Sequence, residues 1–179
     1  MPSYVAFLRA VNVGGRSVKM AELRAALEEA GFAGVETHIQ SGNVFVHSGR
    51  RSTSSVAAEL SRVIGAFAGF DVPAIVRTPA QVRSSLAVAD GIRPMLAADA
   101  RRYLAFADGP VPAVAAAALD AWDTPGERAR VLGCEVLAEL TIGFRKTTLT
   151  NTRIERLTGC TTTWRDLSVV RAIDQRWGA

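Results

Sequence analysis

The segment Tyr4-Val-Ala-Phe-Leu-Arg-Ala-Val-Asn12, which runs into Gly14-Gly15, decides the fold of this chain. Its β-branched and aromatic residues predict a buried strand, and the two glycines predict a loop that ends it. In residues 20–30 apolar side chains recur at helical spacing, charged residues fill the other face, and Gly31 supplies a stop. The chain therefore opens with a strand, a glycine loop and an amphipathic helix.

The next elements complete a βαββαβ order. Residues 35–40 and 44–47 predict two short strands that pair antiparallel around Ser41-Gly42. Residues 53–67 then predict a helix, and residues 71–77 predict another strand. This order is that of the ferredoxin-like unit, in which two helices cover one face of a four-stranded antiparallel sheet.

The register of the first hairpin follows from the length of its turn. A two-residue turn would place Gln40 opposite Asn43 and Glu36 opposite His47, with Ile39 on the other face of the sheet. A cross-strand pair between Glu36 and His47 is then expected. Two histidines and a glutamate without further ligand spacing do not indicate a metal site, so no metal is predicted.

The second half of the chain repeats the order of the first. Residues 78–89 predict a connecting helix, and residues 90–94 form the break between two domains, 1–89 and 90–179. The elements expected after the break are a strand at 102–107, a helix at 112–122, a hairpin of 128–132 and 135–142, a helix at 150–157, a strand at 161–164 and a last amphipathic helix. We therefore predict an α+β protein of two tandem ferredoxin-like units with antiparallel sheets, plus a C-terminal helix.

The composition is that of a folded protein. Of 179 residues, 49% are hydrophobic and 21% are charged, which argues against disorder, collagen-like repeats and a disulfide scaffold. Cys134 and Cys160 are far apart without CxxC spacing, and no basic run leads into an apolar segment near Met1, so a cytoplasmic location is predicted. The longest apolar stretches are shorter than the roughly 20 residues of a membrane span, so no membrane partner is expected.

The formal net charge of +4 suits an anionic partner. The basic residues are scattered along the chain, which leaves non-specific nucleic-acid binding as an alternative prediction. Residues 41–48 match the RNP1 pattern of RNA-recognition motifs only at Gly42, Phe45 and Val46, so such a motif is disfavoured.

The glycine loop, residues 12–19, is the first candidate site. Because it joins a strand to a helix start, free backbone N–H groups and the positive end of the helix dipole would face one pocket. Gly14 and Gly15 would let successive N–H groups form a concave nest, and Arg16 and Lys19 would add positive charge for a phosphate or carboxylate. Neither GxxxxGK[ST] nor GxGxxG is present. The alternative is a plain glycine turn with solvated basic residues.

Two further polar segments are candidate sites. The hairpin tip, residues 40–43, offers more hydrogen-bonding groups than a turn needs, although such residues are also ordinary in turns. The basic segment, residues 145–151, precedes a helix start, where its cations and hydroxyls would converge; helix capping by Thr150, Asn151 or Thr152 is the alternative. The predicted ligand-binding residues are Arg9, Asn12, Gly14, Gly15, Arg16, Lys19, Gln40, Ser41, Asn43, Arg145, Lys146, Asn151 and Trp164, the last with packing as its alternative.

The same segments carry a family resemblance. They are Phe7-Leu-Arg-Ala-Val-Asn-Val-Gly-Gly-Arg16 with Lys19-Met-Ala-Glu-Leu23, then Ile39-Gln-Ser-Gly-Asn-Val44, and finally Lys146-Thr-Thr-Leu-Thr-Asn151 with Trp164. These resemble the LRGINVGG and KMAEL, YIQSGNV, K-[ST]-K-L-TN and RNW patterns of a bacterial family of unknown function numbered 1697. The resemblance spans nearly the whole chain and implies no particular reaction.

The departures from the family pattern fall in the third segment. Thr148 stands where the family has a second Lys, and Thr162-Thr163 precede Trp164 where the family tends to have Arg-Asn. If those positive groups hold an anion in relatives, the resemblance implies that this chain holds it less well.

These observations predict a two-lobed protein that binds a small anionic ligand, bearing phosphate or carboxylate, in a cleft between its lobes. An enzyme acting on an anionic substrate is a further alternative. No GxSxG motif or Cys–His pair indicates nucleophilic catalysis, and Glu22 or His38 are the candidate general bases. No cofactor is predicted. An exposed sheet face would also allow a homo-oligomer.

Overall fold

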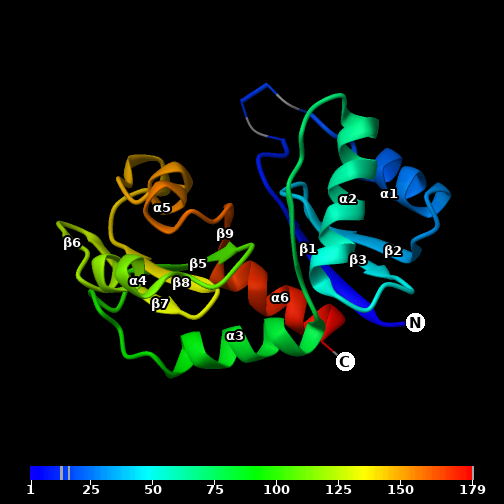
Figure 1. Cartoon of the computed structure of the whole chain (residues 1–179). Coiled ribbons are helices and arrows are strands. Elements are labelled where there is room, and N and C mark those ends of the chain that lie inside the picture. The colour runs from blue at the N-terminus through cyan, green and yellow to red at the C-terminus, as the bar shows by residue number, and fades with distance from the viewer. Residues whose placement is uncertain (13, 16, 179) are drawn as a thin grey trace. The chain divides into compact units, whose positions relative to one another are not determined.

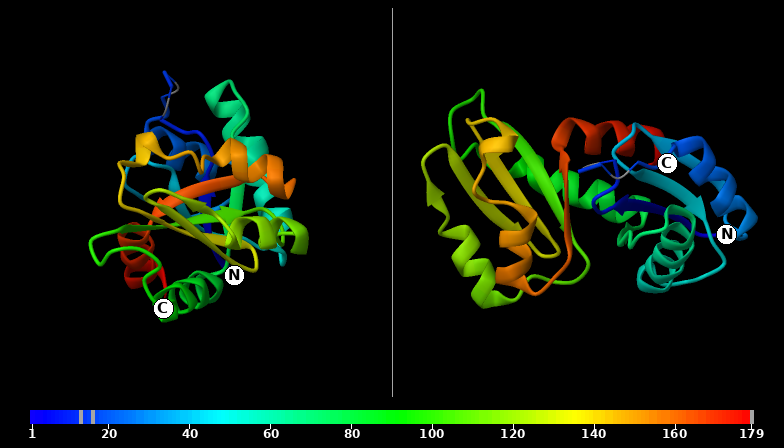
Figure 2. Two further views of the ribbon diagram at one scale, coloured as in Figure 1. Left: turned by 90° about the vertical axis from the view of Figure 1, so that its left-hand side faces the viewer. Right: turned by 90° about the horizontal axis from the view of Figure 1, so that it is seen from above.

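The computed structural model describes residues 1–12, 14–15 and 17–178, and it divides the chain into two compact units. The first unit comprises Met1–Val82 and Ile173–Ala179, and the second comprises Arg83–Ala172. Each unit has one antiparallel sheet with two helices on one of its faces (Figures 1 and 2). The predicted α+β class with two antiparallel sheets and a C-terminal helix is confirmed. The predicted division between residues 89 and 90 stays a prediction.

The first unit has the ferredoxin-like order. Its elements are β1 (Ser3–Leu8), α1 (Met20–Glu29), β2 (Ala33–His38), β3 (Asn43–His47), α2 (Thr53–Ala68) and β4 (Ala74–Arg77). The strands are arranged β2-β3-β1-β4, and all neighbours are antiparallel. This arrangement places the first strand of the chain at the centre of its sheet.

The apolar core of the first unit lies between its sheet and the two helices. Leu8 of β1, Leu23 of α1 and Leu60 of α2 each have at most 1% of their surface exposed. Burying a side chain of this size contributes roughly 1.5–3 kcal/mol. β1 is shorter than predicted and ends at Leu8, because Ala10 and Asn12 take the left-handed backbone conformation, with φ of 57° and 56°.

The predicted register of the first hairpin is wrong by two residues. His38, rather than Gln40, pairs with Asn43, and Glu36 pairs with Phe45 rather than with His47. The connection therefore consists of residues 39–42, a four-residue loop that carries the hairpin tip.

Two residues in this loop show why a two-residue turn does not form. Gly42 has a φ of 76°, and a Cβ atom placed on it would lie 2.9 Å from Cβ of Leu8. The amide of Leu8 donates to the carbonyl of Gly42 at 2.8 Å, so the loop folds down against the end of β1. Ile39, at φ 51°, is 49% exposed in the loop instead of facing a sheet partner.

The second unit repeats the ferredoxin-like order. Its elements are β5 (Arg101–Ala107), α4 (Ala113–Asp120), β6 (Asp123–Thr124), β7 (Glu127–Leu132), β8 (Glu135–Leu140), a short 3-10 helix η1 (Phe144–Lys146), α5 (Asn151–Thr158) and β9 (Thr162–Asp166). The sheet order is β6-β7-β8-β5-β9. The predicted tight turn at Gly133-Cys134 is confirmed, because Leu132 pairs with Glu135. β6 and η1 have no counterpart in the prediction.

Two helices link the units along the chain. These are α3 (Pro79–Gly91) and the C-terminal α6 (Leu167–Trp177). In the first unit, Trp177 stacks on Phe45 with ring centroids 5.5 Å apart, and so covers part of the sheet face opposite α1 and α2. The predicted homo-oligomer stays a prediction. None of the helices in the described part of the chain is long and apolar enough to cross a membrane.

Candidate functional site

The glycine loop between β1 and α1 is closed by the side chain of Asn12. Oδ1 of Asn12 accepts a hydrogen bond from the amide of Val18 at 2.7 Å, and Nδ2 donates to the carbonyl of Val18 at 3.2 Å. Asn tolerates the left-handed conformation that this position requires better than most residues do. A predicted ligand residue therefore has a structural function in the loop.

The same Asn12 joins the glycine loop to the hairpin tip. Its Nδ2 atom also donates to the backbone carbonyl of Gln40 at 2.7 Å. Both segments follow or precede strands at the same end of the first sheet, since Leu8 of β1 bonds Gly42 of the tip. Two of the three predicted segments are thus in contact through described residues.

The glycines and Lys19 present polar groups on this surface. Gly14 and Gly15 are exposed, with φ of 60° and 83°, so the backbone conformation rather than lack of space favours glycine there. Lys19 is the N-cap residue of α1, and its side chain makes no capping bond. Its ammonium pairs with Glu22 at 3.0 Å, which offsets part of its positive charge. Arg16 and Val13 lie outside the described residues.

The other residues of the first unit's predicted set have mixed roles. Asn43 is fully buried, and its Nδ2 atom donates to the carbonyl of His38 and to Oγ of Ser41, both at 3.1 Å. Gln40 and Ser41 are exposed, whereas Arg9 is half-buried and its amide donates to Pro73. Asn43 therefore shapes the hairpin tip, and Gln40 and Ser41 are the residues there that a ligand in solution could reach.

The basic segment of the second unit is anchored by a buried carboxylate. Glu127 of β7 accepts the amide of Thr148 at 2.6 Å and its hydroxyl at 2.9 Å, and it accepts the indole N–H of Trp122 at 3.0 Å. Burial opposes ionisation of Glu127, but the hydrogen bonds from Thr148 and Trp122 outweigh it and hold its pKa below the ordinary value. Arg145 and Lys146 lie on η1 and are exposed.

The start of α5 is capped by a side chain, which is the alternative that the sequence offered to a ligand site in the basic segment. The amide of Arg153 donates to Oγ1 of Thr150 at 3.3 Å, which makes Thr150 the cap rather than Asn151 or Thr152. Oδ1 of Asn151 instead accepts the hydroxyl of Thr162 at 3.0 Å and so ties α5 to β9. Both polar side chains are used within the unit.

Trp164 of β9 packs in an aromatic cluster. Its ring lies 5.8 Å from that of Tyr103 and 5.4 Å from that of Phe144, the residue that begins η1. Only 7% of Trp164 is exposed, and its Nε1 atom is buried without a hydrogen-bond partner among the described residues. Packing accounts for the ring, and Phe144 directly precedes the basic segment.

Arg165, the neighbour of Trp164, is a buried cation that the sequence pattern did not single out. It is 6% exposed, and its Nη1 atom donates to Oγ1 of Thr163 at 2.9 Å and to the carbonyl of Trp164 at 2.8 Å. Burial lowers the pKa of its guanidinium to about 9, so it stays charged at neutral pH. Arg165 lies in the segment Thr162–Asp166, where Trp164 is the one apolar residue, so the sequence carries no signal of its burial.

The predicted set is therefore split between the two units. Arg9, Asn12, Gly14, Gly15, Lys19, Gln40, Ser41 and Asn43 belong to the first unit, and Arg145, Lys146, Asn151 and Trp164 belong to the second. Within the first unit the structure brings the glycine loop and hairpin tip together. Convergence of all three segments in one cleft stays a prediction. The described residues contain no group of three or more side chains suited to hold a metal ion.

A hollow in the first unit, which we call the Arg50 hollow, has no counterpart in the sequence prediction. Its volume is about 400 Å³. It is lined by Ala30, Gly31, Phe32, Ser48, Gly49, Arg50 and Glu59. These residues come from three separated segments without a recognisable motif, so no pattern in the chain could have assembled them.

A family model described as a protein of unknown function (DUF1697) matches residues 1–136. The chain belongs to this family. The identification made from the three sequence segments is confirmed, and it carries no activity with it. No curated protein matches the chain in sequence.

A solved structure supports the fold of this DUF1697 protein. The conserved bacterial protein SP0830 from Streptococcus pneumoniae is 20% identical to the chain, with a TM-score of 0.76. The similarity covers 100% of this chain and 99% of that one. At this level of identity it establishes a shared fold over the whole length.

Proposed function

We propose that this protein binds a small anionic ligand, bearing a phosphate or a carboxylate, where the glycine loop meets the hairpin tip. The observation that carries the proposal is the hydrogen bond from Asn12 to the carbonyl of Gln40 at 2.7 Å, which unites the two segments in one surface. The surface includes the start of α1, whose first turn receives no side-chain cap from the described residues. Unbonded N–H groups and the positive end of the helix dipole favour an anion there.

The cations assigned to the ligand are Arg16 of the glycine loop and Lys146 of the basic segment. Lys19 is the weaker candidate, because its ammonium already pairs with Glu22. Lys146 is exposed on η1, and Glu127 holds the segment that follows it. We propose that Arg16 and Lys146 bind the same ligand, in a cleft between the two lobes.

Equilibrium titration tests the proposal. Inorganic phosphate and succinate are titrated at constant ionic strength into the wild type, Arg16→Ala, Lys146→Ala and the double variant. Removing one charge-assisted hydrogen bond costs about 1.5–3 kcal/mol, so each single variant is expected to bind roughly tenfold or more weakly. Arg130→Ala, an exposed change on β7, is the control and should leave affinity unchanged.

Three outcomes contradict parts of the proposal. No saturable binding by the wild type refutes the anion site. A loss in Arg16→Ala but not in Lys146→Ala refutes the shared cleft and confines the ligand to the first unit. Binding of a DNA or RNA oligonucleotide that falls steeply with salt, without binding of the small anions, supports the nucleic-acid alternative instead.

A further inference from the structure

The Arg50 hollow lies at the opposite end of the first sheet from the glycine loop. The glycine loop precedes α1 and the hairpin tip precedes β3, whereas the hollow is lined by Ala30 and Gly31 after α1 and by Ser48 and Gly49 after β3. Its volume of about 400 Å³ is in the range of pockets that hold small molecules. Any ligand held there is separate from the anion proposed above.

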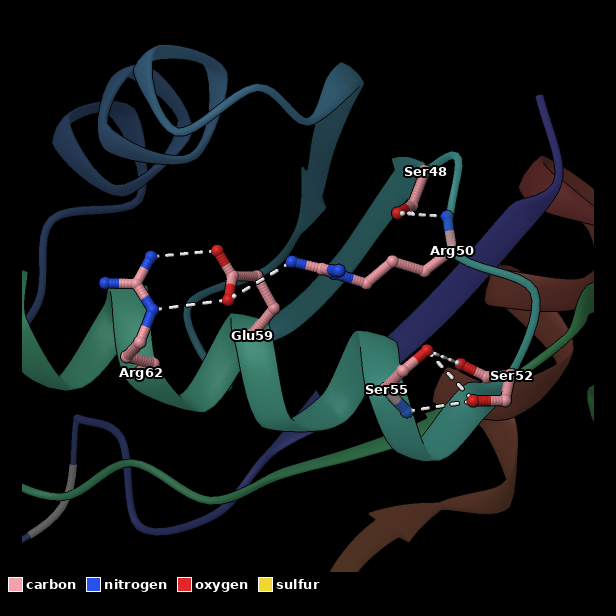
Figure 3. Close-up of polar contacts among 6 residues, drawn as sticks. All are labelled: Ser48, Arg50, Ser52, Ser55, Glu59 and Arg62. Carbon is pink, nitrogen blue, oxygen red and sulfur yellow. Dashed lines mark hydrogen bonds and ion pairs between the residues drawn. The ribbon is translucent and has the colours of Figure 1, made fainter.

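The backbone of Arg50 is fixed beside the hollow. The hydroxyl of Tyr4 donates to the carbonyl of Arg50 at 2.6 Å, and the amide of Arg50 donates to Oγ of Ser48 at 3.2 Å. Figure 3 shows the Arg50 side chain extending from this anchor toward Glu59 of α2. The backbone from which the guanidinium extends is thus held in place by two hydrogen bonds.

Glu59 is held mainly by another arginine. Nη2 and Nε of Arg62 donate to its two carboxylate oxygens at 2.8 and 3.2 Å, whereas Nη2 of Arg50 lies 3.4 Å from Oε2 (Figure 3). The hydrogen bonds from Arg62 are the main cause of the lowered pKa of Glu59, which therefore stays ionised at neutral pH. Two arginines face one carboxylate, so the group has one positive charge in excess.

Donors are left over at the hollow. A guanidinium has five N–H donors, and within the described part of the chain the ion pair with Glu59 is the polar interaction of the Arg50 side chain. The hydroxyl of Ser48 accepts the Arg50 amide but donates to no described residue, although only 6% of Ser48 is exposed. A polar ligand with two acceptor oxygens would satisfy both groups.

We propose that the Arg50 hollow is a binding site for a small organic carboxylate, with Arg50 and Ser48 as its ligand-binding residues. The planar fork of Arg50 matches the two oxygens of a carboxylate. A single negative charge balances the excess of one positive charge, whereas a phosphate dianion would leave the group with one negative charge in excess. Ala30 and Phe32 supply apolar surface for a short hydrocarbon chain.

Propionate titrated into the full-length ¹⁵N-labelled protein at constant ionic strength tests the proposal. Saturable chemical-shift changes at the amides of Gly31, Gly49 and Arg50 are the expected result. Shifts that rise linearly without saturation, or saturation by inorganic phosphate but not by propionate, overturn it. Propylamine should not compete.

Variants separate the assigned role from a general charge effect. Arg50→Gln should weaken propionate binding at least tenfold. Arg51→Gln removes the same charge from the next residue, which is exposed and does not line the hollow, and should change affinity less than twofold. Equal effects of the two changes refute the site.

The Glu59→Gln variant distinguishes ligand binding by Arg50 from a purely structural role of the Arg50–Glu59 ion pair. Removing the competing carboxylate releases Arg50 and should strengthen propionate binding severalfold, and a weaker or unchanged affinity contradicts the proposal. Arg50→Lys keeps the charge but not the planar fork, and should bind with intermediate affinity. Arg50→Lys also replaces Arg50→Gln as the test if the latter does not fold. Wild-type affinity for propionate in Arg50→Lys would refute recognition of the carboxylate by the planar fork.

Discussion

The side chain of Asn12 donates a hydrogen bond to the backbone carbonyl of Gln40 at 2.7 Å, while the same side chain both accepts from and donates to Val18. One residue therefore closes the glycine loop and attaches it to the hairpin tip. Its left-handed backbone, at φ 56°, adds a second reason for Asn at this position.

Asn12→Ala should destabilise the protein. The change removes three hydrogen bonds and leaves alanine, which has no polar side chain to stabilise the left-handed backbone. The free energy of unfolding should fall by about 2–4 kcal/mol. Urea unfolding measures the change. Asn12→Asp keeps the acceptor for the Val18 amide and should fall between Asn12→Ala and the wild type. A loss below about 0.5 kcal/mol for the alanine variant would show that these bonds do not hold the loop.

Gly42→Ala should be more destabilising than Gly14→Ala. Both glycines have positive φ, at 76° and 60°, so both variants incur backbone strain of about 1 kcal/mol. Only at Gly42 would the new Cβ meet another atom, Cβ of Leu8 at 2.9 Å, whereas nothing lies within 4 Å at Gly14. The additional cost of overpacking is about 1–3 kcal/mol. Equal midpoints in thermal unfolding would contradict the close approach of Gly42 to Leu8.

Glu127 should make stability depend on acid pH. Because its pKa is lowered in the folded state, its stabilising contribution is present above the ordinary value of 4.5 and is lost as pH falls through the folded pKa. Unfolding free energies measured from pH 7 to pH 3 should therefore fall more steeply for the wild type than for Glu127→Gln. At neutral pH the variant should be less stable by about 1–3 kcal/mol. Parallel pH profiles would show that the carboxylate does not ionise as inferred.

Glu36 should hold the last turn of α6. Its Oε2 atom accepts the indole N–H of Trp177 at 3.1 Å and two N–H groups of Arg176 at 3.0 and 2.7 Å, and these bonds lower its pKa. Glu36→Gln should increase amide hydrogen exchange in residues 174–177 at neutral pH. Exchange elsewhere, for instance at Leu60 in α2, serves as the control. Unchanged exchange near Trp177 would assign the docking of this turn to its stacking on Phe45 alone.

The basic segment shows how far local sequence patterns could predict the site. The sequence predicts a helix start with hydroxyl residues, and Thr150 is its cap. The anchor of the segment, Glu127, lies in a different strand, and no spacing rule connects it to Thr148. A carboxylate in a strand resembles an exposed charge until the fold places hydrogen-bond donors around it.

The sequence by itself determined the order of strands and helices and the two ferredoxin-like units, because the period of apolar residues and the glycines act over a few neighbouring residues. The family followed from the resemblance of three motif segments to the DUF1697 pattern. Only the tertiary structure decided the register of the first hairpin, the shared surface of Asn12 and Gln40, and the Arg50 hollow. The physical reason is the same for all three. Contacts between residues far apart in the chain, such as Gly42 against Leu8 and Arg50 beside Glu59, depend on packing distances that leave no periodic trace in the sequence.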